Sequence, residues 1–218
     1  MIKTLDLPNF GCIFDDIPSN IFKQLQAESN TLEKENHKMT SGLTGRGVAK
    51  HFYMRHQIQK EFLDYTMHLK NVYLNTYKDY LRMFRCFSND VPFVLDNPWY
   101  NLQEKYEFVP NHTHDGVLSY SAWIKIPYNI LDETADGQYA SCFEFTYVGA
   151  SGTVLSELIK VDKSFEGKIM MFPSSMTHCV YPFYTSDSTR VSVSGNILFD
   201  TIKSKIWELN YERKYYKF

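Results

Sequence analysis

The chain has 218 residues, of which 44% are hydrophobic and 16% aromatic, enough for one domain with a full hydrophobic core. Its 23 basic and 25 acidic residues give a net charge of −2, which disfavours a nucleic-acid partner or an anionic membrane surface. There is no C-x-x-C pair for a zinc site, no apolar run of membrane-spanning length and no signal-peptide pattern at the N-terminus. We therefore expect a cytoplasmic protein with free thiols, or one of the host cytoplasm if its source is a virus.

The first part of the chain is predicted to be mostly helical. After a strand and loop in residues 1–18, a helix is expected over 20–37, where apolar residues recur at helical spacing. Residues 38–50 form a Gly-rich loop without the phosphate-loop order, and we expect a surface loop that is a candidate substrate lid, as is the loop around 128–140. A longer helix over about 55–86 should pack on a sheet through an apolar stripe formed by Phe62, Leu69, Tyr73, Tyr77, Tyr80 and Phe84.

From about residue 98 onward, apolar and polar residues alternate in short runs that are typical of β-strands. Turn-forming sequences separate these runs at 134–137, 149–152, 165–167 and 186–188. Such spacing indicates a sandwich or barrel of antiparallel strands. We predict an α+β, mainly β fold, a double-stranded β-helix (jelly roll) buttressed by N-terminal helices. One domain would fill the chain, with a mostly helical part at 1–97, the jelly roll at 98–200 and a C-terminal extension at 201–218.

Three histidines are candidate metal ligands. His112 and His114 are two residues apart, so on a strand their side chains point to the same side. Aromatic and apolar residues of the same parity precede them, which predicts that this side faces the interior; they are Tyr106, Phe108 and Pro110. His178 can complete a set of three protein ligands from a facing strand. Such a set leaves three coordination positions open, as non-haem Fe(II) oxygenases require.

A second candidate group follows His178. Arg190, Ser192 and Ser194 alternate with two valines, so we expect the polar residues to face the interior and the valines to pack under the helices. A buried arginine is costly unless it meets a carboxylate or an equivalent partner. No acidic residue nearby has suitable parity, and the guanidinium fork grips a ligand carboxylate well. We therefore expect Arg190 to hold a ligand, and its removal to leave the fold intact.

Several segments resemble the 2-oxoglutarate/Fe(II)-dependent oxygenase superfamily in the same order, namely 105–108, 112–116, 118–127, 165–173 and 178–196. Within it, the stretch from Trp99 to Leu198 is similar to small phage-type members with an H-x-H-x-G motif. The resemblance implies Fe(II) as metal, 2-oxoglutarate as cosubstrate and dioxygen as oxidant. It implies a dioxygenase, and more specifically a hydroxylase, that acts on a peptide, amino-acid or small-molecule substrate with succinate and CO2 as coproducts.

The metal motif departs from the usual H-x-D or H-x-E of the superfamily, because His114 stands where the acid would be. Three ligand sets are therefore open. The first is His112, His114 and His178, which strand parity favours. The second replaces His114 by Asp115 and requires the strand to break. The third starts at His114 and leaves Gly116 in the acid's place, as in relatives with two protein ligands.

The resemblance also implies roles around the cosubstrate. An arginine at this distance beyond the distal histidine, followed by x-Ser, holds the far carboxylate of 2-oxoglutarate, which assigns this task to Arg190 and Ser192. Tyr106 is a candidate hydroxyl donor to the cosubstrate. Trp123 lies where relatives often carry an inward tyrosine, and we expect its indole to wall the pocket.

One function of another class competes with this interpretation. A cupin-like module that binds a metal and a sugar or small molecule shares jelly-roll strands and histidine ligands. It has no need for an Arg-x-Ser pair at this distance after the last histidine. The sequence identifies neither the primary substrate nor the oligomeric state.

Overall fold

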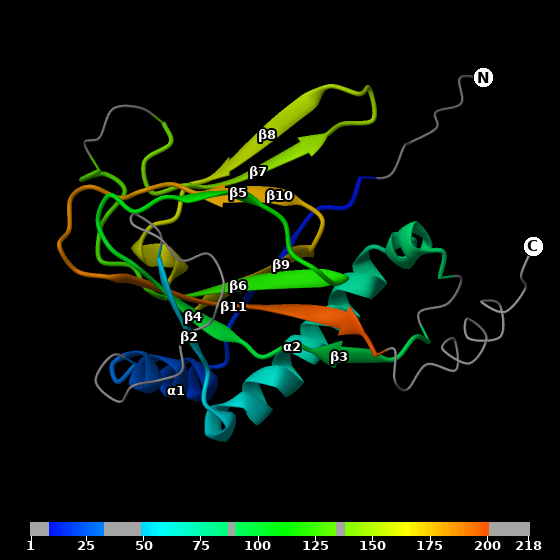
Figure 1. The fold of residues 1–218 in the computed structure, drawn as a ribbon, viewed down its shortest axis with the longest axis horizontal. Helices are drawn as coiled ribbons and strands as arrows, with labels where there is room; N and C mark the ends of the chain where they lie inside the picture. Colours follow the sequence, from blue (N-terminus) through cyan, green and yellow to red (C-terminus); the bar gives the residue numbers. More distant parts are fainter. Residues whose placement is uncertain (1–8, 33–48, 87–89, 134–137, 201–218) are drawn as a thin grey trace, which may run out of the picture.

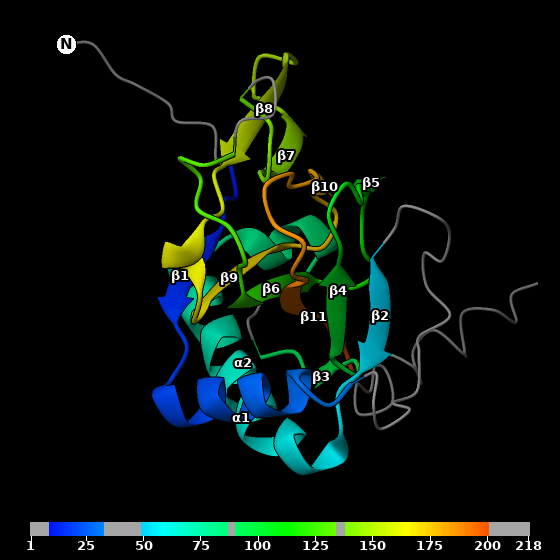
Figure 2. The same ribbon diagram turned by 90° about the vertical axis from the view of Figure 1, so that its left-hand side faces the viewer.

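A computed structural model describes residues 9–32, 49–86, 90–133 and 138–200. Two antiparallel sheets face each other, and two helices cover the outer face of the larger sheet (Figure 1). The view in Figure 2 shows both helices on the same side of that sheet, with the smaller sheet on the other. The predicted mainly β jelly roll with N-terminal helices is thus confirmed.

The larger sheet contains seven strands and has long β11 near its centre. Its order along the main path is β1 (Ile13–Asp16), β9 (Lys168–Pro173), β6 (Leu118–Lys125), β11 (Arg190–Phe199), β4 (Trp99–Gln103) and β2 (Lys50–Tyr53). The short β3 (Phe93–Leu95) also pairs with β11, at the last residues of β11. The strands β4 and β6, which flank β11, therefore help to position the residues that project from it.

The smaller sheet has four strands in the order β5 (Val109–His112), β10 (Thr177–Val180), β7 (Phe143–Val148) and β8 (Val154–Ile159). The turn at 149–152 connects β7 and β8, as its glycines predict. A short 3-10 turn, η2 (Lys163–Phe165), precedes β9.

The helices are shorter than the apolar periodicity predicts. They are α1 (Ser19–Ser29) and α2 (His56–Thr76), and a 3-10 turn, η1 (Tyr80–Phe84), follows α2. The aromatic stripe continues across the break after Thr76, because the Tyr73 ring contacts both Tyr77 and Tyr80. The Tyr80 hydroxyl donates to the Val117 carbonyl at 2.5 Å, so a tertiary contact fixes the chain where a continued helix was expected.

A strand begins at the last residue of the expected Gly-rich loop, Lys50. Residues 50–53 form β2, whose pairing with β4 places His51 opposite Asn101. The alternation of buried and exposed residues in these four residues is too short to distinguish a strand from a loop in the sequence. The rest of the loop at 38–48, the turn at 134–137 and the extension at 201–218 lie outside the described residues.

Two hydrophobic cores lie on opposite faces of the larger sheet. One packs the helices on the sheet and contains Val191 and Val193, which confirms the predicted alternation along β11. The other fills the space between the two sheets and is rich in aromatic rings, including Trp123, Phe143 and Phe172. The polar residues of β11 project into this second space, beside the aromatic core.

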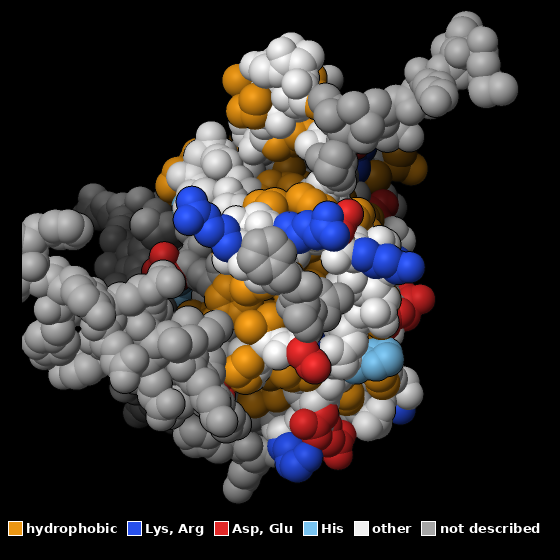
Figure 3. Space-filling model, turned by 90° about the vertical axis from the view of Figure 1, so that its right-hand side faces the viewer, with side chains coloured by type: hydrophobic (Ala, Val, Ile, Leu, Met, Phe, Trp, Pro, Cys, Tyr) orange, Lys and Arg blue, Asp and Glu red, His pale blue; other side chains and the backbone are white. Residues whose placement is uncertain are grey.

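The surface carries charges of both signs. Figure 3 shows Lys, Arg, Asp and Glu side chains interspersed with hydrophobic ones on the face at the right of Figure 1. Among the described helices, none combines the length and the apolar character needed to cross a membrane.

Candidate metal centre

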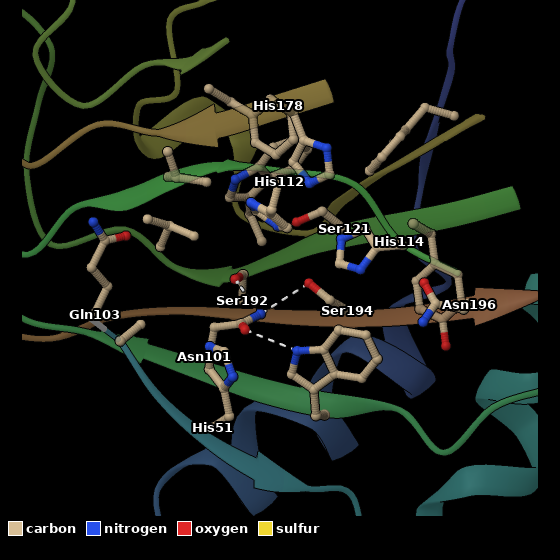
Figure 4. A pocket seen from close by; sticks show the side chains of 18 of the residues that line it. His51, Asn101, Gln103, His112, His114, Ser121, His178, Ser192, Ser194 and Asn196 are labelled. Carbon is tan, nitrogen blue, oxygen red and sulfur yellow. Dashed lines mark hydrogen bonds between the residues drawn. The ribbon is translucent and has the colours of Figure 1, made fainter. Parts of the chain in front are cut away.

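His112, His114 and His178 come together between the sheets. One potential ligand nitrogen from each of them lies within 4.8 Å of the others. His112 and His178 are direct cross-strand partners in the register of β5 and β10, so their side chains share one face of the smaller sheet. Figure 4 shows the three imidazoles pointing toward one another over the serines of β11. A metal ion at their centre would be reached by all three.

Backbone carbonyls orient two of the three rings. His112 Nδ1 lies 2.8 Å from the Pro110 carbonyl, and His178 Nδ1 lies 2.9 Å from the Met176 carbonyl. A carbonyl can only accept, so Nδ1 carries the hydrogen and Nε2 keeps its lone pair. This is the outer hydrogen bond that metal-binding histidines usually make.

His114 lies just past the end of β5, so strict strand parity does not place it. Its backbone N–H donates to the Ser174 carbonyl at 2.9 Å, which ties this segment to the turn before β10. Gly116 follows with φ of +118°, and a Cβ there would lie 2.9 Å from the Ile197 carbonyl oxygen. The last glycine of H-x-H-x-G is therefore required by backbone conformation and by close packing on β11.

Burial favours the neutral form of two of these imidazoles. Burial and, to a lesser extent, the nearby His112 lower the pKa of His178 to about 3 and that of His114 to about 4. The His178 ring stacks on Phe143 at a centroid distance of 5.1 Å and meets the edge of Phe172 at 5.0 Å. Neutral imidazole is the form that binds metals, so neither His114 nor His178 has to lose a proton to bind one at pH 7.

Four other residues that the sequence analysis placed at the site or facing the interior are exposed; they are Asp115, Tyr106, Phe108 and Pro110. Asp115 is exposed at the rim of the site and does not belong to the group of close ligand atoms, which consists of the three histidines. The expectation for Tyr106 was wrong: its side chain is 64% exposed, its φ is +69°, and its ring packs on Tyr184. Phe108 and Pro110 are also exposed: Phe108 precedes the first residue of β5, and Pro110 lies where the pairing of β5 with β10 shifts register.

A cavity of about 660 Å³ surrounds the histidines. It is lined from the larger sheet by Arg190, Ser192 and Ser194, and from the smaller sheet by Phe143 and Val180. Trp123 also lines it, as expected, and is 3% exposed. The cavity thus joins the metal-ligand group to the predicted anchor in a single space.

Arg190 is buried and its charge faces neutral acceptors. Nε and Nη2 both donate to Gln103 Oε1, the first at 3.0 Å. Nη1 donates to the Tyr128 hydroxyl at 2.7 Å and to the Ser141 carbonyl at 3.1 Å, and Nη2 donates to the Tyr181 carbonyl at 3.0 Å. All five guanidinium hydrogens are used, and among the described residues no carboxylate pairs with it.

These bonds correct the expectation that Arg190 could be removed without cost to the fold. Its loss would leave several buried acceptors without donors, which costs about 1–3 kcal/mol for each. Gln103 occupies the Nε–Nη2 edge, which is the edge that grips a carboxylate with two parallel bonds. A bound carboxylate would take the place of the Gln103 oxygen or share this edge with it.

Asn101 organises the serines of β11. Trp99 Nε1 donates to Asn101 Oδ1 at 3.0 Å, which fixes the orientation of the amide. Its Nδ2 then donates to Ser192 Oγ at 3.1 Å and to Ser194 Oγ at 2.9 Å (Figure 4). Because both hydroxyls accept from the amide, their own hydrogens are available to an acceptor in the cavity.

Sequence reasoning missed Gln103, Tyr128 and Asn101. A signal for two of them exists, since Trp99, Asn101 and Gln103 alternate along β4 with Tyr100 and Leu102, which are buried toward the helices. Tyr128 follows β6 in a loop, and no periodicity places it.

The comparisons with known proteins agree with this geometry. Residues 97–196 match a family model described as a 2OG-Fe(II) oxygenase. That match contains all three histidines and Arg190. Over these residues the chain matches the family of 2-oxoglutarate/Fe(II)-dependent oxygenases. No curated protein matches the sequence.

Solved structures of this oxygenase class share the fold. A prolyl-4-hydroxylase from Pseudomonas putida aligns with a TM-score of 0.58 at 13% identity, over 87% of this chain and 93% of its own. A prolyl hydroxylase from Trichoplax adhaerens, in complex with a hypoxia inducible factor peptide fragment, aligns with a TM-score of 0.54 at 10% identity, over 90% and 88%. The epimerase SnoN, in complex with Fe3+, alpha ketoglutarate and nogalamycin RO, aligns with a TM-score of 0.54 at 12% identity, over 88% of this chain and 80% of its own. These likenesses show that the chain shares the fold of these proteins.

Proposed function

We propose that this oxygenase hydroxylates a peptide or small-molecule substrate, with Fe(II) held by His112, His114 and His178 and 2-oxoglutarate anchored by Arg190 and Ser192. The observation that carries the proposal is the joining of two groups in one cavity. Three imidazoles converge on one point, and a buried guanidinium without an acidic partner among the described residues lines the same space.

The donor set fits the metal. Imidazole nitrogen is a suitable ligand for Fe(II), and three such ligands leave positions for a chelating cosubstrate and dioxygen. When bound, the iron and 2-oxoglutarate supply an oxidative decarboxylation that yields succinate and CO2 and drives hydroxylation of the substrate. An all-imidazole set carries no negative charge, so the carboxylate of the cosubstrate would offset part of the metal's charge.

The chain's own residues bind, orient and exclude water. Arg190 would grip the far carboxylate of 2-oxoglutarate with its Nε–Nη2 edge, and Ser192 would donate its hydroxyl hydrogen to the same group. Trp123, Phe143 and Phe172 line the cavity with apolar surface. They would exclude water from the reacting atoms, which strengthens every charged contact inside.

Both kinds of substrate, a peptide and a small molecule, are supported by likeness to solved structures alone. The peptide complex of the Trichoplax relative supports a peptide substrate, and the nogalamycin complex of SnoN supports a small molecule. We also propose that residues 1–218 form one domain and that the protein acts in the cytoplasm.

The proposal is tested by the turnover of 2-oxoglutarate to succinate in the presence of Fe(II), screened against peptide and metabolite pools. Wild-type protein should produce succinate at a basal rate that a substrate pool increases, and His178→Ala should not. Metal binding without any conversion or binding of 2-oxoglutarate would reject the proposal and favour a cupin-like binding module.

A further inference from the structure

Two serines of β11 are spaced like the two ends of a five-carbon diacid. Ser192 and Ser194 both line the cavity, and residues two apart on a strand are about 7 Å from each other. The two carboxylate carbons of 2-oxoglutarate are joined by four C–C bonds, which span about 5 Å when extended. With a hydrogen bond at each end, one serine can meet each carboxylate. A ligand held at Arg190 and Ser192 therefore brings its second carboxylate next to Ser194.

A single amide prepares both serines in the same way. Asn101 Nδ2 donates to Ser192 Oγ at 3.1 Å and to Ser194 Oγ at 2.9 Å, so each hydroxyl keeps its own hydrogen for an acceptor in the cavity. Neither hydroxyl makes another hydrogen bond among the described residues. Of these two equivalent donors, only Ser192 has a task in the proposed function, which leaves the hydrogen of Ser194 to be explained.

Ser121 adds a third hydroxyl beside Ser194. The register of β6 and β11 pairs these two residues directly, so their side chains are neighbours on the cavity face of the larger sheet. Ser121 is 7% exposed and lines the cavity, yet its hydroxyl makes no hydrogen bond within the described part of the chain. A buried hydroxyl without a partner is uncommon, and it indicates that a ligand or an ordered water supplies the missing bond.

The hydroxyls of Ser121 and Ser194 face the metal-ligand histidines. Figure 4 shows both side chains pointing from the larger sheet into the cavity, toward the three imidazoles. Arg190 is the only lysine or arginine among the described residues that line this cavity, and it lies at the other carboxylate. A second carboxylate would therefore be met by the metal and by the two hydroxyls. Hydrogen bonds to a charged acceptor are roughly twice as strong as bonds between neutral groups.

We propose that Ser121 and Ser194 bind the C1 carboxylate of 2-oxoglutarate, the one next to the keto group, and thereby orient the keto acid toward the metal. This inference rests on the proposed function, because it assigns the second end of the cosubstrate that Arg190 and Ser192 hold. The three histidines bring no negative charge to the metal, so this carboxylate is the anionic group that the site receives. The two hydroxyls fix its direction.

The test compares three alanine variants of serines that line the same cavity, Ser121→Ala, Ser194→Ala and Ser192→Ala. Each Mn(II)-loaded protein is titrated by calorimetry with 2-oxoglutarate and, at up to millimolar concentration, with 2-oxopentanoate. The second ligand keeps the keto acid and carries a methyl group in place of the far carboxylate, so it needs only the metal end of the site. The affinity of each protein for Mn(II) is measured first.

Ser121→Ala and Ser194→Ala should each lower the affinity for both ligands about tenfold, because a hydrogen bond to a carboxylate is lost at the end that the two ligands share. Ser192→Ala is the matched control, since Ser192 lies on the same strand as Ser194 and accepts from the same amide. It should lower the affinity for 2-oxoglutarate and leave that for 2-oxopentanoate unchanged. The affinity for Mn(II) alone should be unchanged in all three variants.

Unchanged binding of 2-oxopentanoate by Ser121→Ala and Ser194→Ala would overturn the inference, assign these hydroxyls to the primary substrate and leave the proposed function standing. An equal loss of 2-oxopentanoate binding in Ser192→Ala, or a loss of Mn(II) affinity in the other two variants, would contradict it as well, because the effects would then not be specific to one end of the ligand. So would wild-type protein that binds 2-oxoglutarate but not 2-oxopentanoate. Absence of 2-oxoglutarate binding to wild-type protein would reject the proposed function and this inference together.

Discussion

The two ends of the cavity differ in how completely the fold satisfies their polar groups. At the Arg190 end, every guanidinium hydrogen has an acceptor, and Asn101 fixes the serines. At the other end, Asp96 and Asp115 are exposed, and among the described residues their carboxylates accept a single hydrogen bond, from the Asn97 N–H to Asp96 at 2.8 Å. A site for an invariant cosubstrate can be built in advance of binding, whereas a substrate end depends on the substrate to complete it. The difference therefore separates the anchor from the recognition surface.

Substitution of a metal-binding histidine, in the cavity between these two ends, should have the largest effect, a loss of metal affinity. His114→Ala should weaken Fe(II) or Mn(II) binding by at least about a hundredfold, because it removes one of three imidazoles that converge on the metal. Asp115→Ala should retain the affinity, since its carboxylate is not among the close ligand atoms. Metal content after dialysis measures the affinity of both variants, and His68→Ala, at an exposed position of α2, is the matched control. The reverse order would move the ligation to Asp115.

Replacement of Arg190 tests the satisfied end. Arg190→Ala should reduce the affinity for 2-oxoglutarate by roughly tenfold to a thousandfold, because a desolvated bidentate contact contributes about 2–5 kcal/mol. Metal affinity without cosubstrate should hardly change. Calorimetry on Mn(II)-loaded protein measures both quantities.

The same variant should also unfold more easily, by a few kcal/mol, since Gln103, Ser141 and Tyr181 lose a buried donor. Chemical denaturation measures this change. A folded Arg190→Ala protein that binds 2-oxoglutarate normally would contradict the anchor assignment.

A smaller effect is expected at Gln103. Gln103→Glu would place a carboxylate of the chain itself on the edge of Arg190 that we assign to the cosubstrate. The internal ion pair should compete and lower 2-oxoglutarate affinity about tenfold. Gln103→Ala, which removes the competitor, should not lower it by this amount, and titration of both variants separates competition from a general loss of structure. Undiminished affinity in Gln103→Glu would place the cosubstrate elsewhere.

Two periods in the sequence were sufficient to predict the jelly roll. The three histidines do meet as predicted, but parity did not place His114, which lies past the end of β5. The period of two along β11 separates Ser192 from Val191 and Val193, and the helical stripe predicts which face the helices cover. The role of Tyr106 could not be predicted in this way. It precedes the first paired residue of β5 and has a positive φ, so strand parity does not apply to it.

The partners of Arg190 were also beyond sequence reasoning. Gln103, Tyr128 and Tyr181 come from three separate segments, and only the packing of β4, β11 and two loops brings them together. The parity argument correctly excluded an acidic partner, but it had no means to count neutral acceptors.

The most direct test of the central claim is the metal stoichiometry of wild-type protein and of His178→Ala, both loaded with Mn(II) as a stand-in for Fe(II) and dialysed. His178 is the cross-strand partner of His112 and donates its Nδ1 hydrogen to the Met176 carbonyl, so its Nε2 is free for the metal. The account predicts about one metal ion per wild-type chain and little or none in a folded His178→Ala protein. Equal metal content in the two proteins would contradict a metal centre formed by these histidines.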